Sequence, residues 1–298
     1  MAGGPFPWVR RMSFRLPVAR TVQSLRKTVQ GWRLRGKTIA LVPTMGSLHE
    51  GHLSLIRLAR KHASRVVISV FVNPTQFGPN EDFNAYPRDE EGDWCKAADA
   101  RADLFYAPSV GEMYPDDFAT RVEVAEISQG LCGASRPHHF AGVATIVTKL
   151  FLQCLPDYAL FGEKDYQQLL VIRQLVKDLN FPVQIVPGPI VREESGLALS
   201  SRNAYLTEQQ RLTVAPQLYQ VLKDMGDDLA HGRDIAQTLL TGRTRLEMAG
   251  FRIDYLEVRH AETLIPFEHE IDGPARLLAA VYLGRTRLID NIPVPQMR

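Results

Sequence analysis

Two histidines, His49 and His52, are the residues of this chain whose types and spacing are best suited to chemistry. They follow an apolar run over 38–42 and precede a helical pattern over 53–62, with Gly51 between them. A strand, a glycine-bearing turn and a helix start present free N–H groups to phosphate. Residues three apart also share one side of a helical turn. The pair therefore predicts a phosphate site, with a partial metal site or a surface position as the alternatives.

Two further polar stretches directly follow expected strands, where an open parallel sheet binds its ligands. In the first, Asn73 and Gln76 are neutral amides suited to a small polar substrate, and a plain polar turn is the alternative. In the second, Lys164 is a point charge suited to phosphate. Its neighbour Asp165 either caps the next helix or accepts ribose hydroxyls, and Gln168 lies one turn further along the same face.

A small, hydroxyl-rich loop over 196–203 contains Ser200, Ser201 and Arg202. Hydroxyl and guanidinium donors suit phosphate, although an ordinary surface loop between domains is the preferred interpretation when the stretch is taken alone. A basic stretch over 135–142 precedes a helical pattern, and an exposed turn is its default interpretation.

Bulk properties exclude several classes of protein. The chain has 298 residues, a net charge of +2, 45% hydrophobic and 23% charged residues, as is typical of soluble globular proteins. The charge favours neither nucleic acid nor an acidic membrane, and no apolar run approaches the roughly 18 residues of a membrane span. Three scattered cysteines argue against a disulfide framework and favour a reducing, cytoplasmic location.

The first part of the chain is basic, with no acidic residue before Glu50. An arginine-rich, acid-poor start is typical of a transit peptide. A flexible basic leader over 1–17 is the preferred interpretation, and Met12 is an alternative start that would make residues 1–11 an extension.

Alternating strand and helix patterns predict an α/β fold with a doubly wound, parallel, Rossmann-like sheet. The expected strands cover 38–42, 66–72, 103–106, 157–161 and 183–186, and the expected helices cover 22–35, 53–62, 88–101, 142–155 and 165–179.

The pattern changes near residue 190, where a segment rich in proline and glycine begins. A cap at Thr207 with Gln210 three residues later predicts a helix over 207–227. A helix over 232–249 and strands over 252–258, 276–283 and 287–290 complete a smaller α+β unit. The predicted domains are 18–190 and 191–298.

Taken together, the polar stretches resemble the pantoate–β-alanine ligase (pantothenate synthetase) family, within the nucleotidyltransferases that carry an HxGH motif. The resemblance runs from about residue 18 to the end and includes Leu288-Ile289-Asp290-Asn291. The stretches that carry it, in the family's order and spacing, are Pro43–His52, Val70–Phe77 with Tyr86-Pro87-Arg88, Ser135–Val143, Phe161–Gln168 and Gly196–Tyr205.

The resemblance implies a two-step reaction. The carboxylate of (R)-pantoate attacks the α-phosphorus of ATP, giving pantoyl adenylate and pyrophosphate. The β-alanine amine then attacks the acyl group and releases AMP and pantothenate. The family further implies Mg²⁺, a homodimer and a small C-terminal lid.

Residue roles carry over by position in the matching motifs. The resemblance implies that His49 and His52 stabilise charge on the ATP phosphates and that Gln76 and Gln168 orient the pantoate carboxylate. Lys164 is implied as a phosphate contact and Ser200, Ser201 and Arg202 as a mobile phosphate loop. The remaining implied contacts are Pro43, Thr44, Met45 and Gly46 for ATP, Gly162 and Asp165 for ribose, Val191 and Leu199 for adenine, and Asn73, Tyr86 and Met45 for pantoate or β-alanine.

The chain departs from the family pattern at Cys132, where many members have Glu, at His138-His139, and at Ala141. No catalytic role is assigned to Cys132 or His138. Asp93 is near the place expected for an acidic Mg²⁺ partner, although ATP enzymes hold Mg²⁺ mostly through phosphates and water.

Two other functions are compatible with parts of the pattern. A nucleotidylyltransferase would use the same fold and histidine pair, but a phosphorylated acceptor would favour more arginine or lysine than the paired glutamines provide. A non-enzymatic nucleotide-sensing module would bind ATP without turnover.

Overall fold

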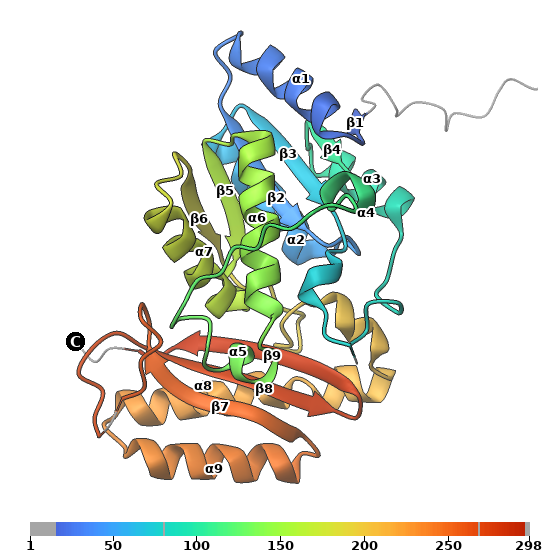
Figure 1. The fold of residues 1–298 in the computed structure, drawn as a ribbon. Helices are drawn as coiled ribbons and strands as arrows, with labels where there is room; N and C mark the ends of the chain where they lie inside the picture. Colours follow the sequence, from blue (N-terminus) through green and yellow to red (C-terminus); the bar gives the residue numbers. More distant parts are fainter. Residues whose placement is uncertain (1–15, 80, 268, 296–298) are drawn as a thin grey trace, which may run out of the picture.

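The computed structural model describes residues 16–79, 81–267 and 269–295. A parallel sheet of six strands forms its larger part, in the order β1-β4-β3-β2-β5-β6 (Figure 1). Its central strands are apolar runs buried on both faces, as parallel sheets covered by helices require. The strands are β1 Val18–Ala19, β2 Ile39–Thr44, β3 Arg65–Val70, β4 Leu104–Tyr106, β5 Tyr158–Gly162 and β6 Gln184–Gly188.

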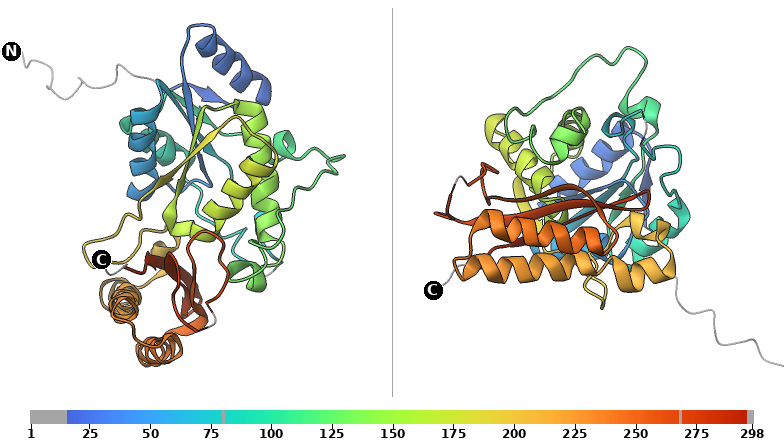
Figure 2. Two further views of the ribbon diagram at one scale, coloured as in Figure 1. Left: turned by 90° about the vertical axis from the view of Figure 1, so that its left-hand side faces the viewer. Right: turned by 90° about the horizontal axis from the view of Figure 1, so that it is seen from below.

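Helices cover both faces of this sheet, so that it forms the middle of three layers (Figure 2). Helices α1 (Val22–Arg33), α6 (His139–Cys154) and α7 (Tyr166–Asp178) contribute to the apolar core on one face. Helices α2 (Glu50–His62) and α3 (Glu90–Asp99) contribute to the core on the other. Short helical turns lie between these elements: η1 Pro74–Gln76, α4 Val110–Met113, α5 Cys132–Ser135 and η2 Glu163–Asp165.

A smaller antiparallel sheet follows, with strands in the order β7-β8-β9 and helices α8 and α9 packed on it (Figure 1). The β8 strand is buried along nearly its whole length because it lies between its two neighbours and under the helices. The elements are η3 Ser201–Tyr205, η4 Gln210–Val214, α8 Gln217–Ala230, α9 Ile235–Met248, β7 Arg252–His260, β8 Ala275–Leu283 and β9 Thr286–Pro293.

The predicted fold class is confirmed: a parallel α/β sheet is followed by a separate small antiparallel sheet. The predicted helix over 207–227 is broken, although Thr207 and Gln210 exchange both capping hydrogen bonds, at 3.0 and 3.2 Å. A π-helical turn over 210–214 intervenes, and α8 begins only after Pro216. Proline has no N–H for a helical hydrogen bond, which explains the break.

The expected leader lies almost wholly outside the described residues. Leu16, at its end, is buried, and its carbonyl accepts a 2.9 Å hydrogen bond from the indole N–H of Trp94. The division into domains at residue 190 stays a prediction. Within the described residues, no helix is long and apolar enough to cross a membrane.

Candidate active site

A cavity of about 1130 Å³ lies where the carboxyl ends of the large sheet meet the small sheet. Strands β2 and β5 are neighbours at the centre of the large sheet. From β2 the chain winds outward through β3 and β4, and from β5 it winds the other way to β6. Such a switch in direction leaves a crevice in which open α/β sheets bind ligands. The segments after β2 and β5 both line this cavity.

The predicted histidine pair forms the start of α2 and faces the cavity. The Nδ1 atom of His49 accepts from the N–H of Gly51 at 3.2 Å, and the Nδ1 atom of His52 accepts from the N–H of His49 at 3.3 Å. Because both Nδ1 atoms are acceptors, the proton of each neutral ring lies on Nε2. The rings stack with their centroids 4.1 Å apart. A Cβ atom on Gly51 would lie 2.9 Å from the His49 ring, so the arrangement requires glycine.

Both imidazoles are neutral at pH 7. Burial, followed by the positive charge of Lys164, lowers the pKa of His49 to about 4. Burial and the neighbouring His49 lower the pKa of His52 well below its ordinary value. Two neutral N–H donors can bind a phosphate oxygen, and neither ring places a fixed positive charge in the cavity.

Asp93 lies behind this turn and does not line the cavity. Its carboxylate accepts the backbone N–H groups of Ser47 and Leu48 at 2.7 and 2.6 Å, and its side chain is buried. The bonds hold Ser47 at a φ of 51° and Gly46 at 83°. Gly46, predicted to touch ATP, also lies outside the cavity lining. Asp93 therefore stabilises the strained turn before the histidines, a role that its sequence position did not indicate.

The predicted amide Gln76 faces the cavity, but Asn73 does not. Asn73 is 1% exposed and donates through Nδ2 to the Oε1 atom of Gln76, at 2.9 Å, and to the carbonyl of Gly142, at 3.1 Å. With its oxygen engaged in this way, the Gln76 amide presents its NH₂ group as a free donor. Asn73, expected at the substrate end, is instead the residue that orients Gln76. Helix α6 approaches closely here, since a Cβ on Gly142 would lie 2.4 Å from the Thr75 carbonyl oxygen.

The second predicted glutamine, Gln168, lines the cavity from the first turn of α7. Its neighbour Gln167 is buried and structural: its Oε1 accepts from the N–H of Cys132, and its Nε2 donates to the carbonyls of Ile127 and Gly130. Adjacent amides thus have different functions, because successive positions on a helix face different directions.

Gly162, Lys164 and Asp165 line the cavity on the turn after β5. Asp165 makes no capping hydrogen bond to α7, so the helix-cap interpretation does not hold. Lys164 forms no ion pair with a carboxylate in the part of the chain that the structure describes. An unpaired ammonium group that faces a cavity is available to an anionic ligand.

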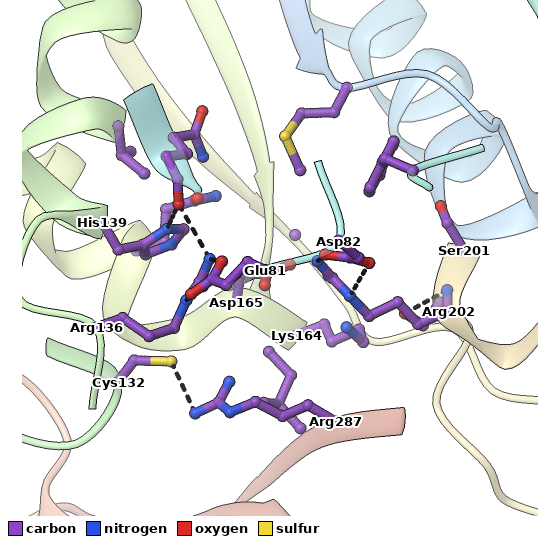
Figure 3. A pocket seen from close by; sticks show the side chains of 18 of the residues that line it. Glu81, Asp82, Cys132, Arg136, His139, Lys164, Asp165, Ser201, Arg202 and Arg287 are labelled. Atoms are coloured by element: carbon purple, nitrogen blue, oxygen red, sulfur yellow. Dashed lines mark hydrogen bonds and ion pairs between the residues drawn. The ribbon is translucent and has the colours of Figure 1, made fainter. Parts of the chain in front are cut away.

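The predicted phosphate loop lines the cavity. Ser200 begins η3 by accepting the N–H of Arg202, and Ser201 donates to the carbonyl of Ser47 at 3.2 Å. Arg202 donates to both carboxylate oxygens of Asp82, at 3.0 and 2.8 Å (Figure 3). Tyr86, as expected, lines the cavity beside the Arg202 guanidinium. The other predicted contacts on the cavity wall are Pro43, Thr44, Met45, Val191 and Leu199.

Two polar clusters on the wall were not predicted as functional (Figure 3). In one, Arg136 pairs with Glu81 and, together with the His139 ring, contacts the backbone carbonyl of Gln76. In the other, the Arg287 guanidinium lies 3.3 Å from the Cys132 sulfur and also pairs with Asp254, so it joins the two parts of the chain. These contacts join residues that are 55 and 155 positions apart in the sequence, so no local pattern could reveal them.

Comparison with known proteins now decides the family. The model of the family described as pantoate–beta-alanine ligase matches residues 17–293. The chain belongs to the pantoate–β-alanine ligase family. The pantothenate synthetase of Rhodospirillum rubrum is 56% identical over 280 residues, covering 94% of this chain and 99% of that protein. The one from Nitrobacter hamburgensis is 54% identical over 278 residues, covering 93% and 98%.

Solved structures of pantoate–β-alanine ligases share the fold. Pantothenate synthetase from Thermus thermophilus superposes with a TM-score of 0.87 at 48% identity, covering 93% of this chain and 99% of that one. The ligase from Francisella tularensis, complexed with beta-gamma ATP and β-alanine, superposes with a TM-score of 0.79 at 34% identity, covering 94% and 98%. The predicted family is confirmed, as is the predicted activity: the chain is a ligase that forms pantothenate from pantoate and β-alanine.

Proposed function

We propose that this ligase uses ATP and proceeds through an enzyme-bound pantoyl adenylate. One observation carries the proposal: a single cavity combines cationic and neutral donors for phosphate with an oriented neutral amide for a carboxylate. The ATP complex of the Francisella ligase supports the choice of nucleotide. Val191 and Leu199 would then contact adenine, and Gly162 and Asp165 would contact the ribose.

In the first step, a pantoate carboxylate oxygen attacks the α-phosphorus of ATP, and the bond to the β-phosphate oxygen breaks. Gln76 and Gln168 would orient the carboxylate through N–H donors, which leave it more nucleophilic than a salt bridge would. Negative charge grows on the leaving pyrophosphate, where the Nε2–H groups of His49 and His52 and the Lys164 ammonium stabilise it. No covalent intermediate with the enzyme is needed, so positioning supplies much of the rate.

In the second step, the β-alanine amine attacks the acyl carbon and loses a proton, and AMP leaves with the former carboxylate oxygen. The mixed anhydride must be kept from water between the two steps. The Ser200–Arg202 loop lines the cavity, and its movement would supply this closure. The Francisella complex with β-alanine supports a site for this substrate in the same fold.

Among the residues that the structure describes, the side chains do not fit a Mg²⁺ site built from protein ligands alone. Within the described ranges, no group of three or more His, Cys, Asp or Glu side chains could hold a metal ion. Asp93, the predicted partner, uses its oxygens to accept backbone N–H groups. Mg²⁺ in this ligase would therefore arrive bound to the ATP phosphates and water, and the two steps above do not depend on a metal held by the protein.

The proposed intermediate can be tested with (R)-pantoate labelled with ¹⁸O in its carboxylate. With ATP, Mg²⁺ and β-alanine, we expect one labelled oxygen to appear in AMP and the other in pantothenate. AMP release should require β-alanine. Unlabelled AMP would rule out the adenylate, and AMP formation indifferent to β-alanine would favour a nucleotidylyltransferase or a plain hydrolase.

The homodimer and the cytoplasmic location follow from the family resemblance and the cysteine usage, and both are part of this proposal. Light scattering coupled to size-exclusion chromatography measures the first, because a dimer has twice the 33.5 kDa mass of the chain. Fractionation of the source cells tests the cytoplasmic location.

A further inference from the structure

Asn291 on strand β9 makes contacts that the reaction described above does not account for. Its side chain is buried, and its Nδ2 atom donates to two backbone carbonyls, those of Glu163 and Lys164, at 3.0 Å each. Its Oδ1 atom accepts from Nε of Arg276 at 2.6 Å. Both hydrogens of the amide thus bind the turn that holds Lys164.

Arg276 fixes which way this amide points. Its guanidinium lies 3.7 Å from the centroid of the Tyr166 ring, and Nη2 lies 3.5 Å from a carboxylate oxygen of Glu163. A guanidinium only donates hydrogen bonds. The atom of Asn291 beside it must therefore be the oxygen, and the NH₂ group must face the two carbonyls.

The residue before Asn291 holds the segment that leads to the Ser200–Arg202 loop, which also lines the cavity. The Asp290 carboxylate forms a bidentate pair with Arg192, at 2.6 and 2.9 Å, and also accepts the N–H of Asn291 at 2.7 Å. Arg192 lies in the short hairpin, closed by its bridge to Ala198, that leads into the Ser200–Arg202 loop. Asp290 and Asn291, which are adjacent on β9, therefore hold both segments assigned to phosphate. These segments are the turn over 163–165 in the larger part of the chain and the Ser200–Arg202 loop in the smaller part.

We propose that Asn291 is a positioning residue for Lys164: it fixes the turn over 163–165 so that the ammonium group meets the ATP phosphates. The proposal rests on the phosphate role given to Lys164 above. Without Asn291, the carbonyls of Glu163 and Lys164, which lie in a partly buried turn, lose their donor and the turn can relax away from the phosphates. Asn291 lines the cavity, but its oxygen and both amide hydrogens are engaged by Arg276 and the two carbonyls, so its role is to position the turn.

The test compares steady-state kinetics of Asn291→Ala, Lys164→Ala and the double variant. We expect Asn291→Ala to raise the KM for ATP by about tenfold, since the two hydrogen bonds that hold the Lys164 turn are lost. The KM for pantoate should stay within about twofold of wild type. In the Lys164→Ala background, Asn291→Ala should have no further effect on the KM for ATP, because residues that act through one another are not additive.

Gln153→Ala serves as the matched control. Gln153 is a buried amide that accepts a 3.0 Å hydrogen bond from Tyr106 and lies outside the cavity lining. Its loss should lower thermal stability and leave the KM for ATP unchanged. Should Asn291→Ala fail to fold, the nearly isosteric Asn291→Asp replaces it, because it keeps the acceptor for Arg276 and loses both donors.

Two failures are distinguishable. If Lys164→Ala leaves the KM for ATP and turnover unchanged, the phosphate role of Lys164 is wrong and the proposed function fails at that residue. If Lys164→Ala impairs the enzyme but Asn291→Ala or Asn291→Asp raises the KM equally in both backgrounds, or not at all, the positioning role is overturned.

Discussion

The two histidines each combine two tasks in one imidazole ring. The Nδ1 atoms accept the N–H groups at the start of α2, as the side chains of a capping box do. The opposite nitrogens remain as donors toward the cavity. A substitution at His49 therefore removes a helix cap as well as the proposed phosphate contact, and the two losses must be separated by experiment.

His49→Asn separates them, because Asn is a favourable N-cap residue and has no imidazole. We expect His49→Asn and Lys164→Ala each to lower turnover at least about tenfold, from lost stabilisation of phosphate charge. Urea unfolding should be close to wild type for both. His49→Ala, with no capping group, should in addition lose about 1 kcal/mol of stability. Near-normal turnover in both His49→Asn and Lys164→Ala would contradict the phosphate assignment.

His139 makes stability depend on pH. Burial, followed by the charge of Arg136, lowers its pKa to about 4 from an ordinary 6.5. Between these values the unfolded chain binds more protons than the folded protein, so stability is present above pH 6.5 and is lost as pH falls toward 4. From pH 7 to pH 5 this group should cost about 2 kcal/mol.

Urea unfolding of wild type and His139→Asn at both pH values measures this effect. Because His49 and His52 are present in both proteins, the comparison isolates His139. The stability difference between the two proteins should shift by about 2 kcal/mol in favour of the variant at pH 5. A difference that is independent of pH would show that His139 is not buried in its neutral form.

At the scale of elements, the turn between β2 and α2 depends on α3. Asp93 of α3 accepts two N–H groups of this turn, and Lys96 donates to the carbonyl of Leu48 at 2.9 Å. Helix α3 therefore determines the position of the histidines although it contributes no residue to the cavity lining.

Asp93→Asn should weaken this support. We expect a loss of about 2 kcal/mol in unfolding free energy, because the hydrogen bonds to a buried carboxylate are replaced by weaker ones. The Mg²⁺ concentration that gives half-maximal rate should not change. Asp89→Asn, at the exposed cap of α3, is the control for a general effect on that helix. A large shift in the Mg²⁺ dependence of Asp93→Asn alone would restore the metal role.

Most elements could be predicted from the sequence because their signals are local. Apolar β-branched runs predict the buried strands, and capping pairs such as Thr207 and Gln210 predict helix starts. The two-residue β1 and the short α5 have no such pattern, since contacts with distant parts of the chain define them. Motif resemblance located the cavity residues, but the orientation of Asn73 and the partners of Asp93 depend on contacts between distant positions.

At the scale of the whole molecule, the cavity is completed by contacts between the two sheets and their loops. The Asp82–Arg202 pair joins the segment after η1 to the loop that begins the small unit, and Tyr205 donates to the carbonyl of Ala85 nearby. Asp82 is paired with the guanidinium that we assign to phosphate.

Asp82→Asn should therefore favour nucleotide binding. Without the competing carboxylate, we expect the KM for ATP to fall about threefold, as is usual for a partly exposed ion pair. The difference in the KM for ATP between Asp82→Asn and wild type should shrink in high salt, because salt screens the Asp82–Arg202 ion pair. Asp224→Asn, which breaks the exposed pair with Arg245 on the small unit, is the matched control and should change nothing. A higher KM in Asp82→Asn would mean that Asp82 pre-orients Arg202 instead.

The order of the elements along the chain also bears on biosynthesis. The histidine turn follows the second strand, whereas the Asp290–Asn291 pair that holds both phosphate segments lies on β9, the last strand described. A nascent chain still lacking β9 would lack both of these supports of the proposed phosphate site. Nucleotide can thus stabilise the protein only once synthesis has passed β9, and a ribosome-bound fragment should not sequester ATP.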